Sequence, residues 1–165
     1  MSFFVTVIGG RSLVNRRQVE NDGPVGFFAV LTDHVEHAGE LQSIAFDTAV
    51  TNEGSAYTPH TGIFVAPVGG LYVFSSTLTS YPHNNAIFSF LKNGNPVSHL
   101  HPHSDSDSPA YDTSAMTIVL ELGKGDDVSV ANRHADESLN GHRLSTFSGF
   151  LLYQYYSEAT TVVGK

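Results

Sequence analysis

From Val25 onward, apolar side chains recur at every second position of the chain. In residues 70–79, Tyr72, Phe74 and Leu78 fall on one face of an extended chain, and residues 113–122 repeat the pattern. Successive side chains of a β-strand point to opposite faces of the sheet, so this alternation predicts strands with one buried face. No segment after Val25 shows a convincing helical period, and we therefore expect an all-β domain.

Turn residues separate the alternating segments. Asn93-Gly94 is a strong hairpin signal because both residues tolerate the positive φ angles of a tight turn, and Gly69-Gly70 and residues 123–126 mark two more turns. The pattern predicts an antiparallel two-sheet jelly-roll sandwich of about ten strands. The clearest strands are expected at residues 26–32, 70–79, 86–92, 113–122, 126–131 and 144–155. Five aromatic residues should fill the core: Phe64, Tyr72, Phe74, Phe147 and Phe150.

Composition excludes several classes of function. The 165 residues suit one domain, and their formal net charge of -8 disfavours nucleic acid and anionic membranes as partners. No apolar stretch is long enough for membrane insertion as a helix. The absence of cysteine excludes disulfides, zinc–thiolate sites and thiol nucleophiles. Neither the G-x-S-x-G nor the H-E-x-x-H motif occurs, so we do not expect an enzyme.

The two ends of the chain differ from its centre. Residues 1–24 combine an apolar start with a polar segment, which indicates a leader or stalk or, equally, a loosely held tail. The start lacks the basic residues of a signal peptide, so a signal was removed or there is none. We expect a globular head over residues 25–156 and a C-terminal tail over residues 157–165.

Six motifs between residues 25 and 153 occur in the order found in one protein family. The most specific is G-x-F-x-x-P-x-x-G-x-Y-x-F, in which Gly62–Phe74 matches every fixed position. The others are Val25–Leu31, Phe46–Gly54 followed by Tyr57, Leu91–Gly94, the L-x-x-G-D-x-V motif at Leu122–Val128, and Ser145–Leu152. On these motifs the chain resembles the C1q globular-head family, within the C1q and tumour-necrosis-factor fold group.

The resemblance implies a secreted, extracellular homotrimer that recognises ligands and is not an enzyme. Apolar residues on both faces of one strand, with Leu71 and Val73 opposite Tyr72 and Phe74, agree with packing between protomers. The leading hypothesis is a lectin-like or pattern-recognition module that binds carbohydrate, a microbial surface or a protein. The alternatives are a cytokine-like ligand for a cell-surface receptor and a purely structural trimerising domain. The chain lacks the collagen stalk of many relatives, so stalk-dependent activities are not implied.

Loops of relatives form their exposed binding surface, and loops can vary without disturbing a rigid core. By this resemblance, the long segment at residues 134–142 and its neighbours are candidates for ligand recognition. The candidate ligand-binding residues are His99, His101, His103, Tyr111, Arg133, Asp136, Glu137, Asn140, His142 and Arg143.

Three histidines alternate along residues 99–103. On an extended chain they point to one side, where three imidazoles could bind zinc or copper or gain charge together near pH ~6. The alternative is an exposed edge strand in which Pro102 prevents pairing with another strand, and this alternative is favoured.

The polar segment 104–112 is a candidate calcium site. The three candidate metal ligands are Asp105, Asp107 and Asp112. Calcium prefers oxygen ligands, and relatives with calcium place acidic residues just before the strand that leads to the L-x-x-G-D motif. The alternative is a solvated loop without metal.

Overall fold

The computed structural model describes residues 23–82, 86–103 and 110–156, which form an all-β domain without a helix. This confirms the fold predicted from the sequence. The twelve strands of these residues are β1 (Gly26–Val30), β2 (Val35–Ala38), β3 (Thr48–Glu53), β4 (Tyr57–Thr58), β5 (Ile63–Val65), β6 (Gly70–Thr79), β7 (Phe88–Lys92), β8 (Asn95–Leu100), β9 (Thr113–Leu122), β10 (Asp127–Asn132), β11 (Glu137–Leu139) and β12 (Thr146–Gln154).

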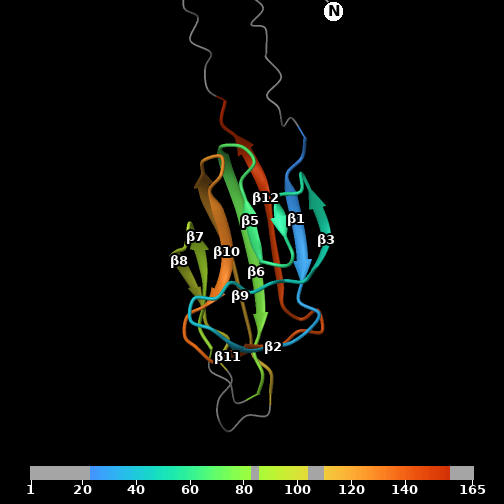
Figure 1. Cartoon of the computed structure of the whole chain (residues 1–165), viewed down its shortest axis with the longest axis vertical. Coiled ribbons are helices and arrows are strands. Elements are labelled where there is room, and N and C mark those ends of the chain that lie inside the picture. The colour runs from blue at the N-terminus through green and yellow to red at the C-terminus, as the bar shows by residue number, and fades with distance from the viewer. Residues whose placement is uncertain (1–22, 83–85, 104–109, 157–165) are drawn as a thin grey trace, which may run out of the picture.

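Two five-stranded antiparallel sheets pack face to face (Figure 1). The strand order is β3-β1-β12-β6-β9 in the first sheet and β4-β5-β10-β7-β8 in the second. The longest pairing joins β6 to β9 over ten residue pairs, from Gly70 with Leu122 to Thr79 with Thr113. A small ribbon of β2 and β11 lies at one end of the sandwich. No described helix is long and apolar enough to span a membrane.

The core between the sheets is aromatic. Tyr72 and Phe74 of β6 and Phe147 of β12 are fully buried, as the alternation predicted. The Phe64 ring of β5 lies 5.2 Å from Phe74 and 5.5 Å from Tyr72, in edge-on contacts. Because each ring touches several others, the sandwich buries a continuous aromatic cluster rather than separate pairs.

Phe150 was placed in the core by the sequence analysis, and this prediction is wrong. Its side chain is 50% exposed, whereas Phe147 on the same strand is fully buried. The two residues are three positions apart, so a strand with a period of two must direct them to opposite faces. Gly149 takes the inward position beside Phe150, and its backbone packs against the Phe74 ring.

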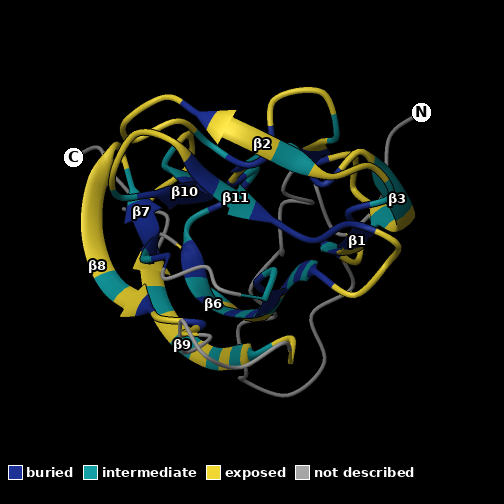
Figure 2. Cartoon of the chain, turned by 90° about the horizontal axis from the view of Figure 1, so that it is seen from below, coloured by how far each residue is buried: buried dark blue, intermediate teal, exposed yellow. Residues whose placement is uncertain are grey.

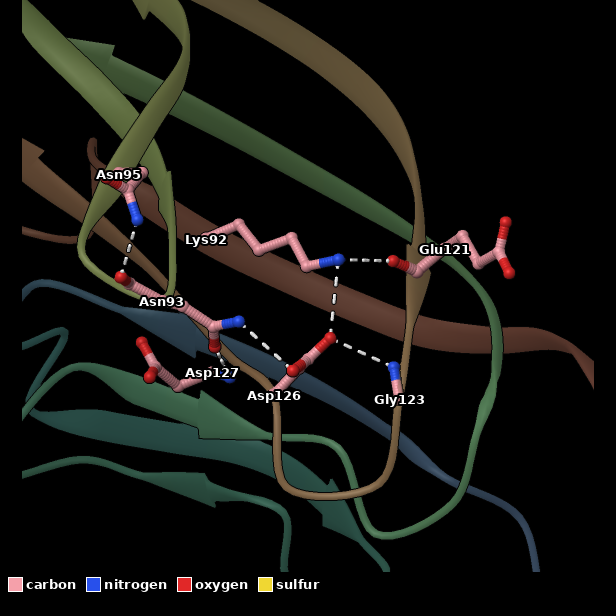
Figure 3. Close-up of polar contacts among 7 residues, drawn as sticks. All are labelled: Lys92, Asn93, Asn95, Glu121, Gly123, Asp126 and Asp127. Atoms are coloured by element: carbon pink, nitrogen blue, oxygen red, sulfur yellow. Dashed lines mark hydrogen bonds and ion pairs between the residues drawn. The ribbon is translucent and has the colours of Figure 1, made fainter.

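The first and last described residues lie together at one end of the sandwich, called here the terminal end (Figure 1). The turn Asn93-Gly94 joins β7 to β8 there, with φ angles of 50° and 74°, which confirms the predicted hairpin. The carboxylate of Asp126 accepts hydrogen bonds from Asn93 Nδ2 at 3.0 Å and from the Gly123 N–H at 2.9 Å. It also lies 3.3 Å from Lys92 Nζ (Figure 3).

These contacts tie the β7–β8 turn to the β9–β10 turn. The side-chain oxygen of Asn93 accepts a hydrogen bond from the Asp127 N–H at 2.9 Å. The hydrogen bonds from Asn93 and Gly123, together with the charge of Lys92, lower the pKa of Asp126. The aspartate of the L-x-x-G-D-x-V motif therefore orders a pair of turns.

The opposite end of the sandwich, the distal end, consists of residues 31–47, 80–82, 86–87, 101–103, 110–112 and 133–145 (Figures 1 and 2). Backbone hydrogen bonds join these segments: Arg143 N–H donates to Leu31 O at 2.8 Å, and Ser80 N–H donates to Asp112 O at 2.9 Å. Viewed onto this end, exposed segments surround a buried interior (Figure 2). The distal loops are therefore fixed to one another around the core.

The first strand ends two residues earlier than predicted, at Val30 rather than residue 32. The Asp47 carboxylate accepts hydrogen bonds from the backbone and hydroxyl of Thr32 and from the backbone of Asp33. These bonds replace strand pairing and turn the chain away from the sheet. Partial burial acts to raise the pKa of Asp47, but the hydrogen bonds outweigh it, and the pKa lies below its usual value.

Candidate functional site

Four aromatic side chains form a row across the distal end. The ring centre of His34 lies 4.6 Å from that of His142 and 5.0 Å from that of Tyr81, and Tyr81 lies 6.3 Å from Tyr111. The Gly141 N–H donates to His34 Nδ1 at 3.1 Å, so the proton of neutral His34 sits on Nε2. Four segments distant in the sequence are thus brought together, and two of the four residues, Tyr111 and His142, were predicted ligand-binding residues.

A hollow of about 390 Å³ opens beside this row, lined by Glu36, His37, Tyr81 and Ser138. Across its edge, His37 Nδ1 lies 3.4 Å from Asp136 Oδ1. His37 and Asp136 both have positive φ angles, of 53° and 65°, although neither is glycine. Such backbone strain is common at functional sites, where surrounding structure holds it in place.

Glu36 and Tyr81 interact across the hollow. Partial burial raises the pKa of Tyr81, and the negative charge of Glu36 raises it further. The hydroxyl of Tyr81 therefore stays protonated and can donate a hydrogen bond, while Glu36 supplies a negative charge. The hollow combines an aromatic surface, a carboxylate, an imidazole and a hydroxyl.

Two predicted ligand-binding residues are buried instead. Glu137 is 6% exposed, and its carboxylate accepts hydrogen bonds from the backbone N–H groups of Ile87 at 2.7 Å and Arg133 at 2.8 Å. Asn140 is 2% exposed. The carboxylate of Glu137 thus connects the 86–87 and 133–137 segments, and it supports the distal surface from beneath. Asp136, His142 and Arg143 are exposed beside it, and Arg133 is half-buried.

The three alternating histidines lie at the side of the molecule. His99 belongs to β8, which is the edge strand of its sheet, and His101 and His103 follow its end. All three are exposed, while Leu100 and Pro102 are buried, so the histidines do point to one side. His99 Nδ1 is 2.8 Å from Ser89 Oγ, and the rings of His101 and His103 lie 5.4 Å apart.

The proposed calcium ligands are only partly described. Asp105 and Asp107 lie outside the described residues, whereas Asp112 Oδ2 accepts a hydrogen bond from the His103 N–H at 2.8 Å. In the described parts of the chain, no three His, Asp or Glu side chains are grouped closely enough to hold a metal ion. Residues 1–22 and 157–165, predicted as leader and tail, also lie outside the described residues.

Sequence reasoning missed His34 of the aromatic row and all four residues that line the hollow, Glu36, His37, Tyr81 and Ser138. The only local sequence signal for strand β2 is the apolar Val35 between the polar residues His34 and Glu36. It was too short to indicate a strand, because β2 has only four residues and β11 only three. The meeting of these strands with Tyr81 depends on the topology of the whole sandwich.

A second exposed surface is the outer face of the β3-β1-β12-β6-β9 sheet. Phe150 of β12 pairs with Val73 of β6, which pairs in turn with Val119 of β9. Phe150 is 50% exposed and Val119 is 55% exposed, and Phe28 and Leu152 add further exposed apolar area. An apolar row across three strands is unusual on the surface of a monomer and indicates an interface.

Comparisons with known proteins agree with the fold and the motifs. A model of the C1q domain matches residues 26–152. Complement C1q tumor necrosis factor-related protein 3 of Mus musculus is 33% identical over 133 residues, which cover 79% of this chain and 52% of that protein. The heavy metal-binding protein HIP of Mytilus edulis is 32% identical over 131 residues, 78% of this chain and 61% of that protein. The chain thus spans little more than half the length of these relatives.

Solved structures show the same fold at lower sequence identity. The globular domain of zebrafish complement 1qA protein matches with a TM-score of 0.65 and 21% identity, covering 79% of this chain and 99% of that one. Eiger TNF from S. frugiperda matches with a TM-score of 0.64 and 13% identity, covering 83% and 98%. These structural similarities establish that the chain has the jelly-roll fold found in both the C1q domain and the TNF protein.

Proposed function

Because this chain belongs to the C1q-domain family, we propose that it is a secreted, non-enzymatic recognition protein that binds its ligand through the distal loops. The ligand classes are those inferred from the sequence: carbohydrate, a microbial surface or a protein. The observation that carries the proposal is the row of His34, Tyr81, Tyr111 and His142, which brings exposed and half-buried rings of four loops onto one end of the sandwich. Rigid sandwiches with such loops are suited to recognition.

A glycan array and a receptor pull-down with the full chain test the proposal. We expect binding that is lost or strongly weakened in Tyr111→Ala, because this side chain is 57% exposed at the distal end. The matched control is Tyr156→Ala, a 63% exposed tyrosine at the terminal end, which should bind as the parent does. Equal binding by parent and both variants would contradict a distal recognition surface, and selective capture of a receptor would favour the cytokine-like alternative.

We propose further that the protein is a homotrimer assembled through the outer face of the β3-β1-β12-β6-β9 sheet. The expected mass in sedimentation equilibrium is three times the 17.8 kDa of one chain. A charge in the row of Phe150, Val73 and Val119 should dissociate the assembly, because burial of an unpaired carboxylate is unfavourable. Val119→Glu tests this, and Val97→Glu, on the other sheet at 44% exposure, is the control. A monomeric parent would overturn the proposal.

Calcium binding near Asp112 is a further proposal. One oxygen of Asp112 already accepts a hydrogen bond, but a carboxylate can accept about four, so a cation could share it. The Mytilus edulis relative named for heavy-metal binding supports a test of metal binding here. Calcium at ~100 times the dissociation constant should stabilise the folded parent by about 2.7 kcal/mol and so raise its melting temperature, whereas the melting temperature of Asp112→Asn should not change. Identical melting with calcium and with chelator would exclude the site.

A further inference from the structure

The hollow contains the carboxylate of Glu36. Glu36 is exposed on β2, and among the described residues it takes part in no ion pair. The nearby carboxylate of Asp136 differs, because His37 lies 3.4 Å from it. Glu36 is therefore a negative charge of the hollow that no ion pair of the described residues neutralises.

An aromatic wall stands next to this carboxylate. Tyr81 is half-buried, with His34 at 5.0 Å on one side and Tyr111 at 6.3 Å on the other. Glu36 and Tyr81 both line the hollow, and the negative charge of Glu36, after partial burial, raises the pKa of Tyr81. A cation placed between the two would gain attraction from the carboxylate and from the face of the ring.

The position of Glu36 is fixed by the ribbon of β2 and β11. Ala38 of β2 pairs with Glu137 of β11, and the Asp136 N–H donates to Ala38 O at 2.9 Å. Glu137 is in turn anchored by the backbone hydrogen bonds that its buried carboxylate accepts. Glu36 and Ser138 therefore face the hollow from strands whose relative position is set, which lowers the entropy lost on binding.

The charge of the chain segment that carries Glu36 favours a cation as well. Residues 31–47 contain four carboxylates and no lysine or arginine, the four being Asp33, Glu36, Glu40 and Asp47. The whole chain has a formal net charge of -8. Phosphate, sulfate and acidic sugars would be repelled from such a segment, whereas a cationic group would be attracted at low ionic strength.

We propose that the hollow of Glu36, His37, Tyr81 and Ser138 binds the guanidinium or ammonium end of an arginine or lysine side chain on a protein partner. This inference rests on the proposed function, since it assigns a ligand chemistry to one part of the distal surface. Glu36 would accept hydrogen bonds from the cation, and Tyr81 would stack against it.

The test is a titration of the ¹⁵N-labelled full chain followed by NMR, with N-acetylarginine amide and N-acetyllysine amide as probes. N-acetylcitrulline amide is the matched neutral probe, because it has nearly the shape of the arginine derivative without its charge. We expect the cationic probes to shift the resonances of Glu36, His37, Tyr81 and Ser138, and the citrulline derivative to leave them unchanged. High salt should weaken the binding.

Two variants distinguish the effect of the Glu36 carboxylate on binding from the effect of the overall negative charge of residues 31–47. Glu36→Gln should weaken binding of the arginine probe about fivefold, the size of effect of an exposed ion pair worth about 1 kcal/mol. Glu40→Gln removes the same charge four residues away and should leave the affinity nearly unchanged. Both residues are exposed, so neither variant should disturb folding.

Several results would overturn the inference. They are equal binding of the citrulline and arginine probes, equal affinity of Glu36→Gln and the parent, and shifts at the hollow caused by methyl glucoside but not by the cations. If the hollow fails these tests while Tyr111→Ala still abolishes ligand capture, only the cation site is wrong. If Tyr111→Ala captures ligand normally, the proposed distal recognition surface fails instead.

Discussion

Replacement of Gly62 by alanine should prevent folding or lower the free energy of unfolding by several kcal/mol. Gly62 has a φ of +70°, and a Cβ atom there would overlap the backbone carbonyl oxygen of Ile44. Ile44 cannot move away easily, because its side chain is 1% exposed in the core and its N–H donates to Val130 O at 2.8 Å. The clash is therefore between two backbone segments, and each is held by a backbone hydrogen bond, since the Gly62 N–H donates to Thr58 O at 2.9 Å.

Gly94→Ala is the matched control for this substitution. Gly94 has a nearly identical φ of +74°, but no atom lies within 4 Å of the position its Cβ would take. Its cost should therefore be that of the left-handed conformation alone, about 1–2 kcal/mol. Chemical unfolding at one protein concentration should show an additional loss for Gly62→Ala of about 1–3 kcal/mol or more, the range for overpacked sites. Equal losses in both variants would show that the backbone near Ile44 adapts.

Truncation of Phe147 to alanine is expected to lower the free energy of unfolding by about 3–5 kcal/mol. The ring is fully buried and lies 4.9 Å from the ring of Phe27, 5.7 Å from Phe46 and 6.1 Å from Phe90. Because it touches residues of both sheets, its removal leaves a cavity that neither sheet can close alone. The loss is a large share of the roughly 5–15 kcal/mol that stabilises a typical domain.

Phe150→Ala on the same strand distinguishes the core from the outer face. The Phe150 side chain is half-exposed in the single chain, so its truncation should cost the chain itself about 0.5 kcal/mol or less. If the outer face assembles the trimer, Phe150→Ala should lower stability in a way that depends on protein concentration, because assembly is linked to folding. The loss in Phe147→Ala should not change with concentration. If instead only the loss in Phe147→Ala depended on protein concentration, Phe147 would lie at the trimer interface and Phe150 in the core.

The contrast between these two phenylalanines shows what the sequence could and could not predict. The alternation along β6 and β12 was sufficient to identify an antiparallel β-sandwich and to bury Tyr72, Phe74 and Phe147. Placing Phe150 in the core ignored that alternation, because an aromatic residue was assumed to be buried. A side chain that is apolar but outward-facing indicates an interface, and the period of two contained that information.

The candidate site was much less predictable. Tyr111 and His142 were named because the loops of the family that the chain resembles form the exposed binding surface, but Glu36 and Tyr81 were not. The hollow unites residues from β2, β11 and the segment after β6, and β2 and β11 are too short for periodicity to detect. Burial of Glu137 was equally hidden, since its three hydrogen-bond donors are backbone groups that any sequence supplies.

The pairing of β1 with β12 also determines how the domain responds to mechanical force. Gly26 at the start of β1 pairs with Phe150 near the end of β12, and both strands reach the terminal end. A pull applied to residues 23 and 156 would therefore open the ladder one residue pair at a time, as a zipper opens, instead of loading all its hydrogen bonds together in shear. The domain should therefore unfold at low force when it is stretched between residues 23 and 156. Force applied to the distal loops would not separate β1 from β12 in this way.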